Sequence, residues 1–336
     1  MMVLAGAVGL WSAFQIDWRA QLGSGFVDGE TQIGLQAAFE GAVIHRTVSI
    51  NLWSSFRYGF LSEAAVGAVV GRAGWLFSDE EYLATPDFDA RLEKSLDRIA
   101  AAQNALAQHD IALILALVPD KARIVADKLR RPRPQVVEAR YAQALAGLLS
   151  RGVHAVDLAQ VLARLPQGAP AFLMRDTHWT PAGAHAVARV LAPEIREATQ
   201  LRSAFEMRAT GTIENSGDLL AFINAGPIGP WLGLAPLQVT QFKVFPKAGS
   251  IGLFDESPQI GTYLVGTSFS ANEDWNFLGF LKLESETDIL NMAQAGAGPF
   301  LPMEELLASD TLRKNAIRAV VWEVPERYLT LAEKQE

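Results

Sequence analysis

The segment Ile260-Gly261-Thr262-Tyr263-Leu264-Val265-Gly266-Thr267-Ser268 joins an apolar run of strand length to a turn that contains glycine. Such a run predicts a buried strand, and the glycine that follows it predicts a tight turn into a helix. The turn would present Ser268 at the carboxyl end of a sheet, where α/β proteins place reactive side chains. The segment therefore predicts an α/β fold with a candidate serine nucleophile.

Helix-like and strand-like segments alternate along much of the remaining chain. Apolar residues recur at helical spacing in some segments and form short continuous runs in others, as amphipathic helices and buried parallel strands do. The expected helices cover residues 89–108, 139–149 and 275–283, and the expected strands cover residues 111–118, 153–158, 172–174, 288–292 and 316–322. This order predicts a mostly parallel sheet with helices on both faces.

The alternation is interrupted at residues 201–257, where glycine and proline are dense and strand-like pieces occur without helices. We interpret this segment as an irregular, β-rich insertion. Residues 66–77 are expected to form two short strands about a glycine turn, at which the main domain begins. The predicted organisation is a helical, signal- or anchor-like N-terminal region, residues 1–65, followed by one α/β domain, residues 66–336.

The composition limits the classes of function. Half of the 336 residues are apolar, enough for a large core, while a net charge of -8 disfavours a nucleic-acid partner. The absence of cysteine excludes disulfides and thiolate metal sites. Residues 1–14 carry no charged side chain. This run is shorter than the ~20 residues of a bilayer span and is typical of a signal peptide or signal anchor, which favours export over a buried N-terminal helix.

Asp176-Thr177-His178 supplies further candidate groups. A carboxylate two residues before an imidazole can hold one ring nitrogen and leave the other as a general base, although the same pattern alone also occurs on surfaces. Thr180 can cap a helix and Pro181 suits its first turn, which places the pair at a helix entry. Together with Ser268, the pair offers the orienting group, base and nucleophile of acyl transfer.

Ser270 is the alternative nucleophile in the same turn. Ser268 is preferred because it follows the strand more closely, and Ser270 is expected to cap the helix or bond to backbone. The backbone N–H of Ser268 is the expected oxyanion donor, and the side-chain amide of Asn272 is either a second donor or a solvent-facing group. Trp179 is interpreted as a stacking wall for a sugar or acyl group, or else as a core residue.

Arg327 and Tyr328 follow the last expected strand, at the sheet edge where α/β proteins bind ligands. Arg327 is expected to bind a substrate carboxylate or to form a structural ion pair with Glu323 or Glu326. The chain has no His-Glu-x-x-His, no carboxylate cluster with ligand spacing, and no Gly-x-Gly-x-x-Gly that opens a helix. We therefore predict no metal and no cofactor.

Two motifs resemble those of a known family. Asp176-Thr177-His178-Trp179-Thr180-Pro181-Ala182-Gly183 and Gly266-Thr267-Ser268-Phe269-Ser270 are similar to motifs of the alginate O-acetyltransferase family of the AlgJ and AlgX type, which has an SGNH-hydrolase-like domain. Supporting stretches are residues 71–77, 118–121, 217–219 and 322–328, so the resemblance covers most of residues 70–330. AlgX carries a further carbohydrate-binding module, whereas this sequence ends at Glu336, so we expect the closer similarity to be to AlgJ.

The resemblance implies an SGNH-hydrolase-like fold in circularly permuted order, since the Asp-His pair precedes the serine, and a triad of Ser268, His178 and Asp176. It implies a periplasmic enzyme that acts in acetylation of a bacterial exopolysaccharide such as alginate through an acetyl-serine intermediate. The N-terminal segment would be either a cleaved signal peptide or an anchor to the inner membrane. A membrane O-acyltransferase would pass on the acetyl group, and a polysaccharide or an accessory carrier protein would accept it.

Two alternatives remain open. An SGNH-type acetylesterase would use the same three side chains with water as the acceptor. A non-catalytic polysaccharide-binding or assembly subunit would keep the fold alone, and the presence of Asp176, His178 and Ser268 argues against it.

Overall fold

The structure is a computed structural model that describes residues 46–166, 168–247, 260–314 and 317–332. The chain divides into two compact units. The first comprises Met1–Ala65 and Phe222–Ala235, and the second comprises Val66–Ala221 and Pro236–Glu336. The two units are considered separately below.

A four-stranded parallel sheet forms the centre of the second unit, among the described residues. Its strand order is β3 (Ala112–Val118), β8 (Ala319–Pro325), β6 (Thr262–Val265) and β7 (Ile289–Asn291). All seven residues of β8 are buried. A strand enclosed on both faces needs apolar side chains in both directions, which explains the continuous runs in the sequence. The predicted mostly parallel sheet is confirmed.

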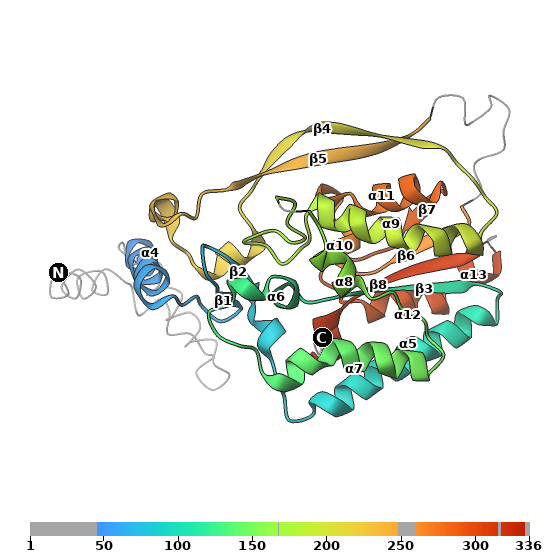
Figure 1. The fold of residues 1–336 in the computed structure, drawn as a ribbon, viewed down its shortest axis with the longest axis horizontal. Helices are drawn as coiled ribbons and strands as arrows, with labels where there is room; N and C mark the ends of the chain where they lie inside the picture. The colour runs from blue at the N-terminus through green and yellow to red at the C-terminus, as the bar shows by residue number, and fades with distance from the viewer. Residues whose placement is uncertain (1–45, 167, 248–259, 315–316, 333–336) are drawn as a thin grey trace, which may run out of the picture. The chain divides into compact units, whose positions relative to one another are not determined.

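Alternate side chains of these strands enter two different cores because a strand turns its side chains to opposite faces. Leu264 and Val321 belong to one core, together with residues of α8 (Leu158–Ala163), α9 (Pro181–Ala198) and α11 (Phe277–Ser285). Val265 and Trp322 belong to the other. The helices of the second core are α5 (Phe88–Ala107), α7 (Gln135–Ser150) and α12 (Phe300–Ala308). Figure 1 shows α9 and α11 on one side of the sheet and α5 and α7 on the other.

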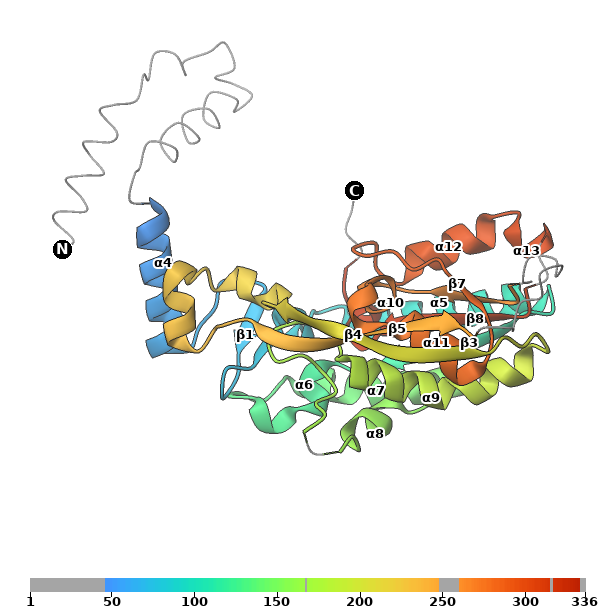
Figure 2. The ribbon, with the colours of Figure 1, turned by 90° about the horizontal axis from the view of Figure 1, so that it is seen from above.

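Two antiparallel pairs accompany the central sheet. As predicted, β1 (Ala68–Val70) and β2 (Leu76–Ser78) pair across a glycine-containing turn. The long strands β4 (Phe205–Asn215) and β5 (Leu237–Pro246) form a ribbon, which confirms a β-rich insertion. The ribbon runs alongside α11 in both views (Figures 1 and 2). The short helices of this unit are α6 (Lys121–Ile124), α10 (Ser268–Ala271) and α13 (Thr311–Lys314).

Two expected strands of the parallel sheet were wrong. Residues 153–158 contribute one isolated bridge, Leu115 to Ala155, before α8 begins at Leu158. Residues 172–174 contribute one antiparallel bridge, Phe172 to Trp179. Both segments are short apolar runs, and a buried loop needs apolar side chains as much as a buried strand does.

The described part of the first unit contains α4 (Arg46–Phe56), the π-helical turn η1 (Arg57–Leu61) and the 3₁₀ segment η5 (Gly226–Leu232). The Ala65 N–H donates to the Phe222 carbonyl at 2.8 Å and ties the two chain segments together. The apolar run at residues 1–14 lies outside the described residues. Within the described ranges, no helix has the length and apolarity required to cross a bilayer.

Candidate active site

The turn after β6 places Ser268 at the first position of α10. The Thr267 hydroxyl caps this helix by accepting a hydrogen bond from the Phe269 N–H at 3.3 Å. A Cβ atom on Gly266 would lie 2.5 Å from the Glu323 Oε2, so only glycine allows the turn to approach β8 this closely. Ser268 is partly exposed, whereas Thr267 and Phe269 are buried.

The structure brings Ser268, His178 and Asp176 together. The His178 Nε2 lies 2.7 Å from the Ser268 Oγ, and the His178 Nδ1 lies 2.6 Å from the Asp176 Oδ1. One imidazole therefore bridges the hydroxyl and the carboxylate through its two ring nitrogens. In this arrangement Asp176 holds the tautomer that carries its proton on Nδ1, which leaves Nε2 as the acceptor that faces Ser268.

Local backbone bonds set the position of the Asp-His pair. The Leu173 N–H donates to the His178 carbonyl at 3.0 Å, and the Thr180 N–H donates to the Ala171 carbonyl at 2.9 Å, so the pair occupies a closed loop. The Thr180 hydroxyl then caps α9, with Pro181 as the first helical residue. The sequence predicted this helix entry.

The second oxygen of the Asp176 carboxylate is bound by the segment after β4. The Asn215 Nδ2 and the Asp218 N–H donate to Asp176 Oδ2 at 3.4 and 3.3 Å. Burial alone would raise the pKa of Asp176, but hydrogen bonds and charge from His178 outweigh it and hold that pKa below its usual value. No sequence pattern selected Asn215 as a site residue. Its proximity to the stretch Gly217-Asp218-Leu219 was the available signal.

Gly217 explains how this segment reaches the Asp-His loop. Its φ is +87°, and a Cβ atom there would lie 2.2 Å from the Arg175 carbonyl oxygen. The Leu219 N–H donates to that same carbonyl, and the Asp218 carboxylate accepts from the backbone N–H and the hydroxyl of Thr177. The β-rich insertion thus stabilises the loop that carries Asp176 and His178 through these hydrogen bonds.

Lys121 supports the loop that carries Asp176 and His178. It was not selected from the sequence as a site residue. Its buried ammonium donates to the backbone carbonyls of Leu76, Met174 and Asp176 at 2.6, 3.0 and 2.9 Å. Burial lowers the pKa of Lys121 to about 7, against the charges of Glu81 and Asp176, which raise it. The three carbonyls require three N–H groups, which only the charged form supplies.

Glu323 holds the serine turn from the adjacent strand. Its fully buried carboxylate accepts from the Thr267 N–H at 2.7 Å, from the Thr267 hydroxyl at 3.0 Å and from the Ser270 hydroxyl at 3.1 Å. Burial raises the pKa of Glu323 even though these bonds lower it. Ser270 is therefore buried and bonded to a carboxylate, while Ser268 faces the imidazole. This contrast favours Ser268 as the nucleophile.

Aromatic rings hold the imidazole in place. The ring of Trp275 stacks on His178 at a centroid distance of 5.3 Å, and the ring of Phe269 lies 4.9 Å away. The interpretation of Trp179 as a wall for a sugar was wrong, because Trp179 has no exposed surface and packs against Phe269 and Phe277 in the core. A side chain without exposed surface has no face to offer a ligand.

The remaining candidates lie beside the turn. The Asn272 Oδ1 accepts from the Asp274 N–H at 2.9 Å and caps a 3₁₀ turn. Phe269, Ser270 and Ala271 direct their N–H groups to Thr267. Of the described N–H groups in α10, that of Ser268 is thus left for a developing oxyanion.

Arg327 has a partner that the sequence did not suggest. Its Nε donates to the Glu80 carboxylate at 3.0 Å, rather than to Glu323 or Glu326. Its guanidinium lies over the rings of Phe269 and Tyr328, at 5.7 and 5.1 Å from their centroids. Arg327 is buried and Tyr328 is partly buried, so the arginine packs beneath the turn and Tyr328 retains exposed surface.

One group of described residues has the composition of a cation site. Ligand atoms of Asp176, His178 and Asp218 lie within 4.8 Å of one another. The hydrogen bonds above already use the Asp176 and His178 atoms, and Asp218 binds Thr177. A cation here would have to break the bond that orients the imidazole, so the geometry favours hydrogen bonding.

Comparison with known proteins identifies the family of the chain. A family model described as "SGNH hydrolase-like domain, acetyltransferase AlgX" matches residues 68–326. The chain belongs to this acetyltransferase family. This confirms the predicted SGNH-hydrolase-like fold and the prediction of an O-acetyltransferase.

Within the AlgX-type acetyltransferase family, the chain is more similar to AlgJ relatives. It is 33% identical to the probable alginate O-acetylase AlgJ of Pseudomonas aeruginosa, over 98% of this chain and 88% of that protein. The solved O-acetyltransferase domain of Pseudomonas putida AlgJ is 36% identical, covers 80% of this chain and 94% of its own, and superimposes with a TM-score of 0.73. The alginate biosynthesis protein AlgX of Pseudomonas putida is 27% identical, over 77% of this chain and 56% of that protein.

Proposed function

We propose that this acetyltransferase acts in O-acetylation of alginate, or of a similar acidic exopolysaccharide, through an acetyl group carried on Ser268. The observation that carries the proposal is the continuous hydrogen-bonded line from Ser268 Oγ through the His178 ring to Asp176, with distances of 2.7 and 2.6 Å. The similarity to proteins named alginate O-acetylase supports the choice of polymer.

The first half-reaction forms the acetyl-enzyme. The Ser268 Oγ attacks the carbonyl carbon of the acetyl donor while His178 Nε2 accepts the hydroxyl proton. The carbonyl oxygen becomes an oxyanion that the Ser268 N–H can stabilise. When the tetrahedral intermediate collapses, the bond to the donor oxygen breaks, and the imidazolium returns the proton to that leaving oxygen.

The second half-reaction repeats these steps with an acceptor hydroxyl. His178 takes the hydroxyl proton, the acceptor oxygen bonds to the acetyl carbon, and Ser268 leaves with the proton from His178. Asp176 stays ionised throughout, because its lowered pKa and its bonds to Asn215 and the Asp218 backbone favour the carboxylate. The aromatic rings of Trp275 and Phe269 limit reorientation of the imidazole between the two halves.

We further propose that the reaction takes place in the periplasm and that a membrane O-acyltransferase supplies the acetyl group. The acceptor is the polysaccharide or a carrier protein that passes the group to it. These assignments follow from the resemblance to the AlgJ and AlgX type and from the apolar run at residues 1–14.

A burst experiment tests the acetyl-serine step. With a chromogenic acetyl ester, a transferase that protects its acyl-enzyme from water should release about one equivalent of product rapidly and then turn over slowly. Mass spectrometry of the quenched burst should place one acetyl group on the peptide that contains Ser268, and Ser268→Ala should abolish the burst. The matched control is Ser270→Ala, which should retain the burst.

Acceptor addition separates transfer from hydrolysis. Acetylated product and a faster second phase after addition of alginate oligosaccharides or a candidate carrier would support transfer. Rapid turnover that no acceptor increases would identify an acetylesterase. Acetyl label on Ser270 in the wild type would contradict the proposed nucleophile, and no acetyl label at all would contradict the catalytic role.

A further inference from the structure

Helix α4 in the first unit turns polar side chains inwards and apolar side chains towards solvent, the opposite of a typical helix on a globular protein. Its inward side carries small polar residues: Ser55 is buried, and a Cβ atom on Gly226 would lie 2.2 Å from the Asn51 Nδ2. A helix that packs on a protein core normally turns apolar side chains inwards and polar ones outwards. The apolar side chains of α4 must therefore meet something other than the core of this unit.

The outward side of α4 and η1 is a continuous aromatic surface. Trp53, Phe56 and Phe60 are 59%, 43% and 81% exposed. Their rings stack in sequence, with centroids 5.7 and 5.2 Å apart. Exposed apolar side chains scattered singly are ordinary, but a stacked row on one helix is not, and such patches mark interaction sites.

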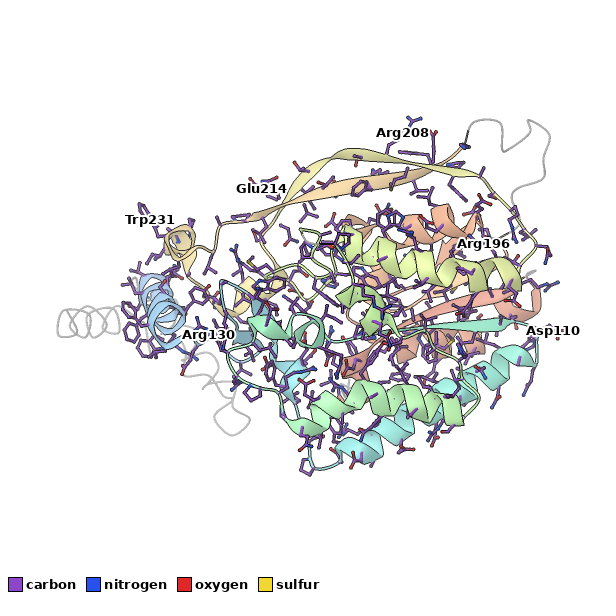
Figure 3. All side chains as sticks on the ribbon, in the orientation of Figure 1. Asp110, Arg130, Arg196, Arg208, Glu214 and Trp231 are labelled. Carbon is purple, nitrogen blue, oxygen red and sulfur yellow. The ribbon has the colours of Figure 1, made fainter. Side chains whose placement is uncertain are left out.

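A fourth aromatic side chain lies in the same unit. Trp231 is 90% exposed on η5, the segment that packs against α4, and Figure 3 shows it at the outer edge of that segment. Nothing within the described residues uses this indole for packing. An indole almost completely in solvent is costly for a free surface and suits a boundary between water and an apolar phase.

The charge pattern favours a lipid surface as the partner. The sequence from Arg46 to Leu61 contains two arginines and no acidic residue, in a chain whose net charge is -8, and Arg57 pairs with Glu63 just beyond this segment at 3.4 Å. Helices that lie in the membrane interface combine tryptophan, phenylalanine and leucine on one side with basic residues and few acids. The 45 residues that precede α4 include the uncharged run at residues 1–14, which is typical of membrane targeting.

We infer that the aromatic face, defined as Trp53, Phe56, Phe60 and Trp231, docks on the surface of a phospholipid bilayer. The helix lies along the headgroup region, with its aromatic rings at the acyl boundary and Asn51 and Ser55 turned away from it. This contact adds to any anchoring by residues 1–14, and it is independent of the chemistry proposed for Ser268. A protein or a segment of this chain that covers the same face would be a different occupant.

The absence of cysteine makes this inference testable at single sites. The full chain is prepared in three versions, Trp53→Cys, Phe60→Cys and Trp231→Cys, each labelled with the polarity-sensitive fluorophore NBD. Leu149→Cys is the matched control, because Leu149 is 66% exposed on α7 in the second unit. Vesicles of phosphatidylethanolamine and phosphatidylglycerol should raise and blue-shift the emission of the first three labels and leave the control unchanged.

A second measurement compares vesicle binding by the wild type with binding by a variant that lacks the aromatic face. Vesicle binding by the full chain with Trp53→Ser, Phe60→Ser and Trp231→Ser should be weaker by about tenfold or more, since each loses apolar surface that the membrane would bury. Leu149→Ser should bind as the wild type does.

Four outcomes would overturn the inference. Blue-shifted emission before vesicles are added would mean that the chain covers its own face. Unchanged NBD emission from a chain that is bound to vesicles would mean that another segment makes the membrane contact. Labels that respond to native membranes but not to protein-free vesicles would identify a protein partner. Wild-type vesicle affinity in the triple variant would show that the aromatic face is not used.

Discussion

Glu323 offers the most direct test of how the serine turn, which carries Ser268, is held in place. Three donors converge on its Oε2: the Thr267 N–H, the Thr267 hydroxyl and the Ser270 hydroxyl, at 2.7, 3.0 and 3.1 Å. Leucine in its place would leave buried donors without an acceptor, at a cost of ~1–3 kcal/mol for each group that finds no other partner. With two of the three donors left unpaired, Glu323→Leu should lose about 2–6 kcal/mol of unfolding free energy, measured by urea denaturation.

Glutamine is the matched control because it keeps an acceptor at the position of Oε2. Glu323→Gln should fold as stably as the wild type at neutral pH or more so, since it removes a buried charge. The raised pKa of Glu323 sets the sign of the pH effect: its contribution to stability is present below the ordinary pKa of 4.5 and is lost as pH rises through the folded value. The glutamine variant should lack that component.

Enzyme activity shows whether Glu323 positions the serine turn. A turn shifted by ~1 Å should lower kcat/KM for a chromogenic acetyl ester by about 10²-fold in the leucine variant, and the glutamine variant should stay within a few-fold of the wild type. A fully active leucine variant would refute the anchoring role. Equal loss in both variants would mean that the negative charge, rather than the acceptor, is what the turn requires.

Three further predictions concern the Asp-His loop and its supports. Asp176→Asn should leave the thermal midpoint within a few degrees of the wild type yet lower kcat by ~10²–10⁴-fold, because the imidazole loses the group that fixes its tautomer; near-normal turnover would move that role elsewhere. Lys121→Met should reduce kcat by about 10²-fold, because the Asp176 carbonyl loses its donor. The matched control is Lys94→Met, which lies on α5 outside the site and should leave kcat unchanged. Equal activity in both variants would contradict the supporting role of Lys121. Burial raises the pKa of Glu81 from 4.5 to about 7, so its contribution to stability is fully present below pH 4.5 and is lost as pH rises through 7. Glu81→Gln should therefore flatten urea-measured stability between those two pH values, and an unchanged slope would assign the effect to another group.

The sequence predicted the parts of the molecule that depend on local pattern. The apolar run before Gly266 and the cap at Thr180 are local signals, so the serine turn and the helix entry beside His178 were expected where the structure has them. The isolated bridge at Ala155 was mistaken for a strand because burial, not pairing, sets the apolar pattern.

The supporting groups could not be predicted in the same way. Asn215, Lys121 and Glu323 act on Asp176 or on the Ser268 turn from separate parts of the chain, and no spacing rule connects such distant positions. Trp179 illustrates the converse error. Its place beside His178 in the sequence suggested a ligand contact, but neighbours in sequence need not face the same side, and the structure turns Trp179 into the core.

The position of β8 has a consequence for the order in which the molecule is assembled. This strand is the last in the sequence among those described, yet it lies between β3 and β6, and Glu326 at its end bonds to the Asp120 N–H across 206 positions. Pairings of such large sequence separation form late because closing the intervening loop is entropically costly. Without β8, β3 is not joined to β6, and the Glu323 carboxylate that holds the serine turn is missing. The turn that carries Ser268 is therefore expected to form only after β8 has paired with β3 and β6, and a fragment that ends before residue 319 should lack it.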